Sequence, residues 1–191
     1  MTTLALAAEA VIDLTGRSDK EALIRRKINA ACRLIQSAGT FPQDLYEASY
    51  SGASIADAYI QSLTLPDRAR QIAYIQDPDR TDRILLRTVA WALDNPDSYD
   101  IGYQAGSVLQ LRLTEKPTSI NVGVYRYLEA LSADADTNWV LTDMFELVVD
   151  YAATWVGIIT GNRDMISAMA QFSGQQLQVY INDRIQQRFS S

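Results

Sequence analysis

The chain has 191 residues, of which 48% are hydrophobic and 21% are charged, and its formal net charge is −6. This length suits one domain and the composition is typical of a globular protein, so we expect a single domain over residues 1–191. The sequence contains no histidine, which excludes the Ser-His and Cys-His nucleophile pairs and most hydrolase mechanisms, and we expect neither an enzyme nor a cofactor.

Charge and cysteine usage restrict the environment further. The 17 basic residues form no Lys/Arg block, which argues against tight binding to nucleic acid. Cys32 is the only cysteine, so no intramolecular disulfide can form, and we expect a buried thiol in a reducing compartment. No apolar run approaches the ~20 residues that cross a bilayer, and Met1 to Leu14 lacks the basic start of a signal peptide. We therefore expect synthesis in the cytoplasm and no membrane association.

The first part of the chain is predicted to be helical over residues 1–48. An Ala/Leu-rich helix over Thr2 to Leu14 ends at Gly16, which tolerates the left-handed conformation of a helix C-terminus. Ser18 and Glu21 have the spacing of a capping box and predict the start of an amphipathic helix over 19–37. Its expected buried stripe consists of Ile24, Ile28, Ala31 and Ile35.

The middle of the chain is predicted to be β-rich over residues 55–130, after a Gly/Ser loop at Ser49 to Ser54. The stretch Ile84 to Leu93 fits neither the helical nor the strand period, so both remain open there. Gly106 marks the turn of a β-hairpin, and we expect the last strand to return across the same sheet. The expected extended regions are Ile55–Leu65, Gln71–Gln76, the hairpin Tyr99–Leu113 and Ile120–Leu128.

The last part is predicted to be helical over residues 136–191. Asp136 or Thr137 caps a helix that ends at Gly161, and Asn162 caps a final helix. The apolar stripe of the first of these helices is expected to be Trp139, Phe145, Val148, Val149, Ala152, Val156 and Ile159. The predicted fold class is therefore α+β, a helical bundle from the N- and C-terminal segments with an inserted antiparallel β-sheet and hairpin.

A succession of short segments carries a family resemblance. EALIRRKINAAC at 21–32 and TFPQDLYE at 40–47 are followed by AYIQSL at 58–63 and LPDRARQIAYI at 65–75. YQAGSVLQLR at 103–112 and GVYRY at 123–127 precede a long helix that starts near Trp139 and ends at Gly161-Asn162. In this order, over about Thr15 to Ile181, the segments resemble the head-to-tail connector proteins, also called adaptor or neck proteins, of tailed bacteriophages.

The resemblance implies a structural virion protein without catalytic activity. It implies a homo-oligomeric ring, commonly of twelve copies, which lies between the head and the tail and contacts the portal protein on one side. A tail protein or second connector would be the partner on the other side, and genomic DNA would pass through the channel without specific binding. The alternative from another class is a small α+β protein-binding or regulatory module of the immunity type.

The acidic residues that could form a metal site or a catalytic site are more simply interpreted as parts of turns and of the surface. The acidic stretches Asp77 to Asp82 and Asp94 to Asp100 lack the glycine position and terminal Glu of a calcium loop, so we interpret them as turns. Asp44 and Glu47 could serve a glycosidase only if they faced each other in a cleft, which nothing in the sequence indicates. We therefore predict neither a metal site nor a catalytic site.

Two sets of residues are predicted to bind the portal or a neighbouring subunit. The first is a stretch rich in arginine. These side chains either form a solvated surface or contact a partner, since arginine is enriched at interfaces. The second is the apolar i, i+4, i+8 repeat of the C-terminal segment, which we interpret as a docking helix. The residues are Arg68, Arg70, Arg80, Arg83 and Arg87, and Ile181, Ile185 and Phe189.

A third set is predicted to line the DNA channel. Acidic side chains in the polar turns around the central hairpin would repel phosphate within a Debye length of roughly 8 Å, and solvated outer loops are the alternative. These residues are Asp94, Asp97, Asp100 and Glu115. The many tyrosines of the central region, rigid and amphipathic, suit surfaces that become buried on assembly.

Overall fold

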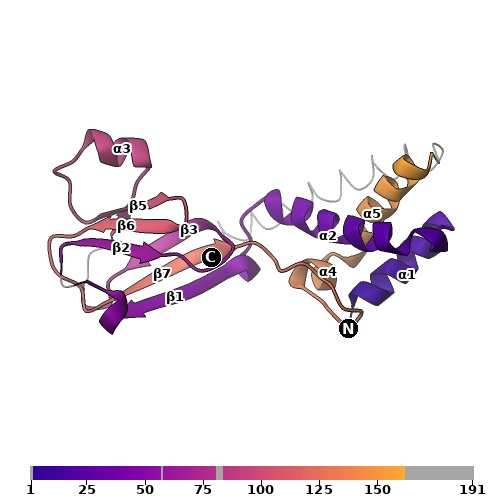
Figure 1. The fold of residues 1–191 in the computed structure, drawn as a ribbon, viewed down its shortest axis with the longest axis horizontal. Helices are drawn as coiled ribbons and strands as arrows, with labels where there is room; N and C mark the ends of the chain where they lie inside the picture. Colours follow the sequence, from indigo (N-terminus) through magenta and orange to yellow (C-terminus); the bar gives the residue numbers. More distant parts are fainter. Residues whose placement is uncertain (1, 57, 81–83, 162–191) are drawn as a thin grey trace, which may run out of the picture. The chain divides into compact units, whose positions relative to one another are not determined.

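The computed structural model describes residues 2–56, 58–80 and 84–161, and the chain forms two compact units, each of which is considered by itself (Figure 1). The helical unit comprises Met1–Thr40 and Leu128–Ser191, and the β unit is Phe41–Tyr127. All of the described strands belong to the β unit. The α+β class predicted from the sequence is confirmed.

The helical unit contains α1 (Leu4–Thr15), α2 (Glu21–Ser37), α4 (Trp139–Asp143) and α5 (Phe145–Thr160). Helices α1, α2 and α5 pack around one apolar core, in which the predicted stripe of α2 is fully buried. Gly16, at a φ of 66°, ends α1, and Gly161, at a φ of 78°, ends α5, as predicted. None of the helices in the described part of the chain has the length and apolar character that a membrane span requires.

Two predicted helix starts are wrong. Glu21 is the first residue of α2, whereas a capping box needs the glutamate at the third helical position; Ser18 lies in a preceding 3-10 turn, η1 (Ser18–Lys20). Asn138, rather than Asp136 or Thr137, caps the helix that follows the β unit, because its Oδ1 accepts a hydrogen bond of 2.8 Å from the Leu141 amide.

The predicted helix up to Gly161 is in fact two helices, α4 and α5. The helix is interrupted at Met144, whose φ of −133° is not helical. Ile159, expected to face inward, is 52% exposed, whereas Val148, Val149, Ala152 and Val156 are buried as predicted. The final helix predicted from Asn162 lies outside the described residues.

The β unit contains two sheets. One has the order β1-β7-β3, with β1 (Leu45–Ser51), β3 (Ala69–Gln76) and β7 (Ser119–Arg126) antiparallel. The other has the order β2-β6-β5-β4, with β2 (Ile60–Thr64), β6 (Val108–Arg112) and β5 (Ile101–Ala105) antiparallel and the short β4 (Leu85–Leu86) parallel to β5. Apolar side chains from both sheets form one core. Its buried members are Leu63, Leu65, Ile72, Ile75, Ile84, Leu109, Leu111, Leu113, Ile120, Val122 and Val124.

The hairpin around Gly106 is confirmed as β5 and β6, but two other predictions for this region are wrong. Strand β7 does not return across the hairpin's sheet; it lies between β1 and β3 in the other one. Residues 45–48, expected to be helical, and 49–51, expected to be loop, form β1. None of the side chains of β1 is buried, so its sequence shows no alternation, and seven residue pairs with β7 hold it in place. The Gly/Ser turn is limited to η3 (Gly52–Ser54).

The ambiguous stretch Ile84 to Leu93 contains both structures. Ile84 enters the core, β4 follows at Leu85–Leu86, and α3 (Val89–Asp94) begins after Thr88. A switch from strand to helix within ten residues explains why neither period fits the whole stretch.

Candidate interaction surface

Exposed apolar side chains gather on β4 and α3. Strand β4 is an edge of the four-stranded sheet, and α3 stands out from strands β5 and β6 (Figure 1). Four residues form what is called the apolar tip below: Leu85 (50% exposed), Leu86 (41%), Val89 (38%) and Leu93 (66%). Single exposed leucines are common on protein surfaces, whereas several on two consecutive elements indicate a contact surface.

The apolar tip is anchored on its strand side. The Leu85 amide donates to the Asp100 carbonyl at 2.9 Å and the Arg87 amide donates to the Gly102 carbonyl at 2.8 Å, which completes the short parallel ladder with β5. Just before the tip, Ile84 is only 5% exposed and fixes the strand to the core.

Helix α3 is held at its start by local contacts. The Thr88 hydroxyl caps it by accepting a hydrogen bond of 3.2 Å from the Trp91 amide. The Arg87 guanidinium lies 4.8 Å from the centre of the Trp91 ring, within the range of a cation–π contact. Ala92 is fully buried and gives the helix its inward face.

Arg112 of β6 holds the other end of α3. Its Nη1 lies 3.1 Å from the carbonyl oxygens of Ala92, Asn95 and Pro96, so one guanidinium satisfies three acceptors where the helix ends. The Asn95 side chain adds a hydrogen bond of 2.8 Å to the Trp91 carbonyl. A helix of six residues is not stable alone, so these contacts are what keep the apolar tip in one conformation.

An ion pair supports the turn before β5. The Arg80 guanidinium lies 2.6 Å from Asp100 Oδ1, and the Thr114 amide and hydroxyl donate to the same carboxylate at 3.1 and 3.0 Å. The hydrogen bond from Arg80, followed by those from Thr114, lowers the pKa of Asp100 to about 2 although partial burial opposes this shift. Asp100 has a φ of 55°, in the left-handed region that Asp and Asn tolerate better than most residues.

The predicted site residues fall into separate groups. Arg87, Asp94 and Asp97 lie on or beside α3, and both carboxylates are exposed. Arg80 and Asp100, assigned from the sequence to different surfaces, pair with each other. The remaining described members are Arg68 and Arg70, around the start of β3, and Glu115, exposed after β6. Arg83, Ile181, Ile185 and Phe189 lie outside the described residues.

Four of the eight tyrosines of the β unit lie against cations. The shortest of these contacts places Arg126 4.4 Å from the centre of the Tyr46 ring. The others join Arg70 to Tyr127, Arg112 to Tyr103 and Lys116 to Tyr59 at 5.7 to 5.8 Å. Tyr74 instead crosses Gly123 on β7, where a Cβ atom would collide with its ring, and donates its hydroxyl to Glu47 on β1.

The predicted acidic turn is confirmed at Asp77 to Asp79. The Asp79 amide donates to Asp77 Oδ1 at 3.0 Å, and the Arg80 amide donates to the Asp77 carbonyl at 3.2 Å. Within residues 2–56, 58–80 and 84–161, no group of three or more acidic or cysteine side chains is placed to hold a metal ion.

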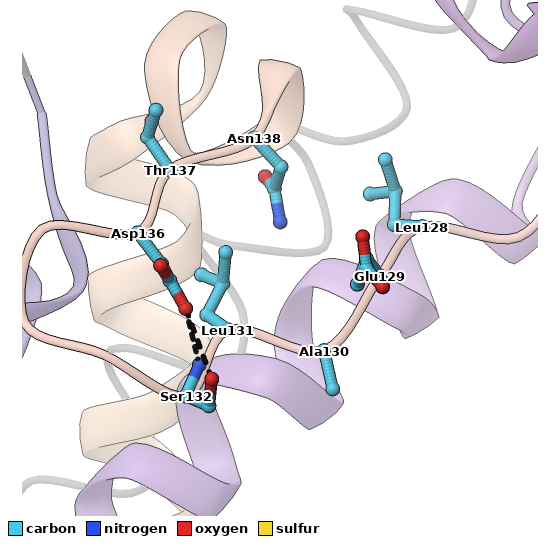
Figure 2. Close-up of a pocket in the computed structure, with 8 residues that line it drawn as sticks. All are labelled: Leu128, Glu129, Ala130, Leu131, Ser132, Asp136, Thr137 and Asn138. Carbon is cyan, nitrogen blue, oxygen red and sulfur yellow. Dashed lines mark hydrogen bonds between the residues drawn. The ribbon is translucent and has the colours of Figure 1, made fainter.

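A hollow of about 500 Å³ lies in the helical unit, along the loop from Leu128 to Asn138 (Figure 2). Asp136 points across the loop and accepts hydrogen bonds from the amides of Ser132 and Ala133 at 2.7 and 2.8 Å, which lowers its pKa. Leu131 exchanges two backbone hydrogen bonds with the Asn29 side chain. These polar groups shape the loop itself, so the hollow is a consequence of its fold.

The sequence interpretation missed the apolar tip because exposed and buried leucines look alike in a short run of unclear period. One usable signal for a helix at this position was Arg87 four residues before Trp91, because side chains at this spacing can meet on a helix. Neither a protein-family model nor a curated protein matches this chain.

Proposed function

We propose that this chain is a structural subunit of the ring that joins the head of a tailed bacteriophage to its tail, and that it has no catalytic role. The apolar tip carries this proposal. Its polar contacts serve to hold Leu85, Leu86, Val89 and Leu93 in place, and the leucines themselves remain open to solvent. A surface that is ordered and apolar before any partner is bound is what an assembly subunit needs.

The order of segments that resembles the connector proteins supports the same function. In this proposal the helical segments at both ends of the chain form a bundle into which the β unit is inserted. The partners are the portal protein, further copies of this chain in a ring of about twelve, as the resemblance implies, and a tail or second connector protein. The protein is then part of the virion neck.

Arginines and carboxylates have separate roles in this proposal. Arg68, Arg70 and Arg87 face the portal or a neighbouring subunit, whereas Arg80 supports the fold through Asp100. Asp94, Asp97 and Glu115 are exposed and are the remaining candidates for the channel lining. With −6 on each copy, twelve copies would carry on the order of −72, which would keep DNA from adhering.

Sedimentation with and without the cognate portal ring tests the proposal. We expect the full chain to co-sediment with the portal at about twelve copies per ring and to remain small without it at low concentration. A chain that never joins the portal at any salt concentration, and that stays monomeric, contradicts the proposal and favours the protein-binding or regulatory module.

A further inference from the structure

One row of residues crosses all four strands of the sheet β2-β6-β5-β4. The registers pair Ile60 with Arg112, Arg112 with Ile101, and Ile101 with Leu85. The middle of this row is covered, since Arg112 binds the carbonyls at the end of α3 and Ile101 is only 2% exposed. Both ends are open, because Ile60 is 61% and Leu85 is 50% exposed.

The Ile60 end, like the apolar tip, is held by hydrogen bonds to neighbouring segments. Gln61, 1% exposed, receives a hydrogen bond of 2.9 Å from the Ala56 amide and donates one of 2.7 Å to the Ala56 carbonyl. The Tyr59 carbonyl accepts from the Leu113 amide at 2.8 Å, and Lys116 lies 5.7 Å from the centre of the Tyr59 ring. Tyr59 (51% exposed) and Ile60 are therefore two exposed apolar side chains at this edge of the sheet, called the β2 edge below, beside the positive charge of Lys116.

We propose that the apolar tip of one copy packs against the β2 edge of the next copy, with Leu85 and Leu93 lying on Ile60 and Tyr59. The two surfaces are at opposite edges of one sheet, about 14 Å apart at the usual strand spacing, so they cannot cover each other within a copy. A contact between unlike surfaces repeats from copy to copy and closes into a ring when its rotation allows. This contact deepens the proposed function and rests on it for the closure of the ring.

Charge complementarity supports this head-to-tail contact. Asp94 and Asp97 are exposed at the end of α3, so the contact places carboxylates near Lys116 of the next copy. The charged groups would lie at the rim of the contact, where solvent still reaches them, so they remain available to line a channel.

Cross-linking between engineered cysteines tests the contact. The native Cys32 can stay, because its side chain is buried and burial raises the pKa of its thiol to about 11, which leaves it unreactive near neutral pH. We would mix full-length Leu93→Cys with full-length Ile60→Cys, bind the mixture to the portal ring and add a short bismaleimide. We expect a covalent dimer from the mixture and a ladder of multimers from the double variant.

Matched controls identify the surface. Leu45→Cys changes a leucine that is 42% exposed on β1 of the other sheet, and we expect it to cross-link with neither variant. All of the substituted positions are exposed, so the melting curves of the variants should match that of the wild type. The pair Leu85→Cys and Tyr59→Cys provides a second, independent test of the same contact. We also expect Leu93→Asp to weaken self-association by about tenfold or more, since it removes the burial of one leucine.

The possible failures are distinguishable. Cross-linking of Leu93→Cys with itself would overturn the head-to-tail contact in favour of a symmetric dimer. A ring on the portal, seen by sedimentation, without cross-links from either cysteine pair would overturn this contact and leave the proposed function standing. Absence of both the ring and the cross-links would overturn both proposals.

Discussion

Replacing Arg112 with methionine should release α3 from the four-stranded sheet. The change keeps an unbranched apolar side chain and removes the guanidinium, whose Nη1 reaches the carbonyls of Ala92, Asn95 and Pro96, each at 3.1 Å. A hydrogen bond to a charged group contributes about 1.5–3 kcal/mol. Because a single nitrogen serves all three acceptors and water can replace part of the interaction, we expect a loss of about 2 kcal/mol, which raises the population of the open helix about 30-fold.

Hydrogen exchange measured by mass spectrometry reports this opening. The amides of Ala92 and Asn95, which donate within α3 to Thr88 and Trp91, should exchange faster, whereas the Val148 amide of the helical unit should not change. Arg33→Met, at an exposed position of α2, is the matched control and should alter stability by less than about 0.5 kcal/mol. Wild-type exchange at Ala92 and Asn95 in a folded Arg112→Met protein would refute the role assigned to Arg112.

Two further predictions concern acidic residues. The pKa of Asp100 is lowered in the folded state to about 2, so its contribution to stability is complete above the unfolded value near 4 and is lost as the pH falls through 2. In Asp100→Asn the new side chain tolerates the same backbone conformation. This variant should remove about 1 kcal/mol of the pH dependence, because solvent screens the partly exposed pair with Arg80. Chemical unfolding of both proteins between pH 5 and pH 2 measures this difference, and equal pH profiles would contradict it. Replacement of Asp94, Asp97 and Glu115 together by Lys should weaken the contact between copies through Lys116, and the particles that do assemble should retain DNA at low salt and eject it slowly. Unchanged ejection from assembled particles would exclude these residues from the channel lining.

Local patterns in the sequence predicted the elements whose faces differ most in burial. Helix α2 is the clearest case, since Ile24, Ile28, Ala31 and Ile35 repeat on one face and all four are buried. The hairpin was equally predictable, because a glycine lies between two runs of alternating residues, and Gly106 indeed adopts a φ of 62°. In both cases the information needed lies within a few residues of the element itself.

Pairing between distant strands could not be predicted in this way. Strand β1 has no buried side chain and owes its structure to β7, about 75 residues later in the chain. The ion pair between Arg80 and Asp100 likewise depends on where β5 begins relative to the turn before β4. For this reason the sequence alone assigns the two residues to different surfaces. Asp100 is left out of the lysine replacement above because changing it would disturb the fold as well as the charge.

The same limit explains why the candidate surface was visible only in the structure. Ile60, Arg112, Ile101 and Leu85 are scattered along the sequence, and only the strand registers bring them into one row. Within that row the exposed fraction is decided by α3, which covers Ile101 and leaves both apolar ends open. A chain that only needed a stable β unit could place polar residues at these ends, as it does at the β2 end of the next row on the same face, where Ser62 shares a hydrogen bond of 2.8 Å with Gln110 of β6. The contrast between these neighbouring rows is therefore a physical reason to assign the exposed ends to contacts between molecules.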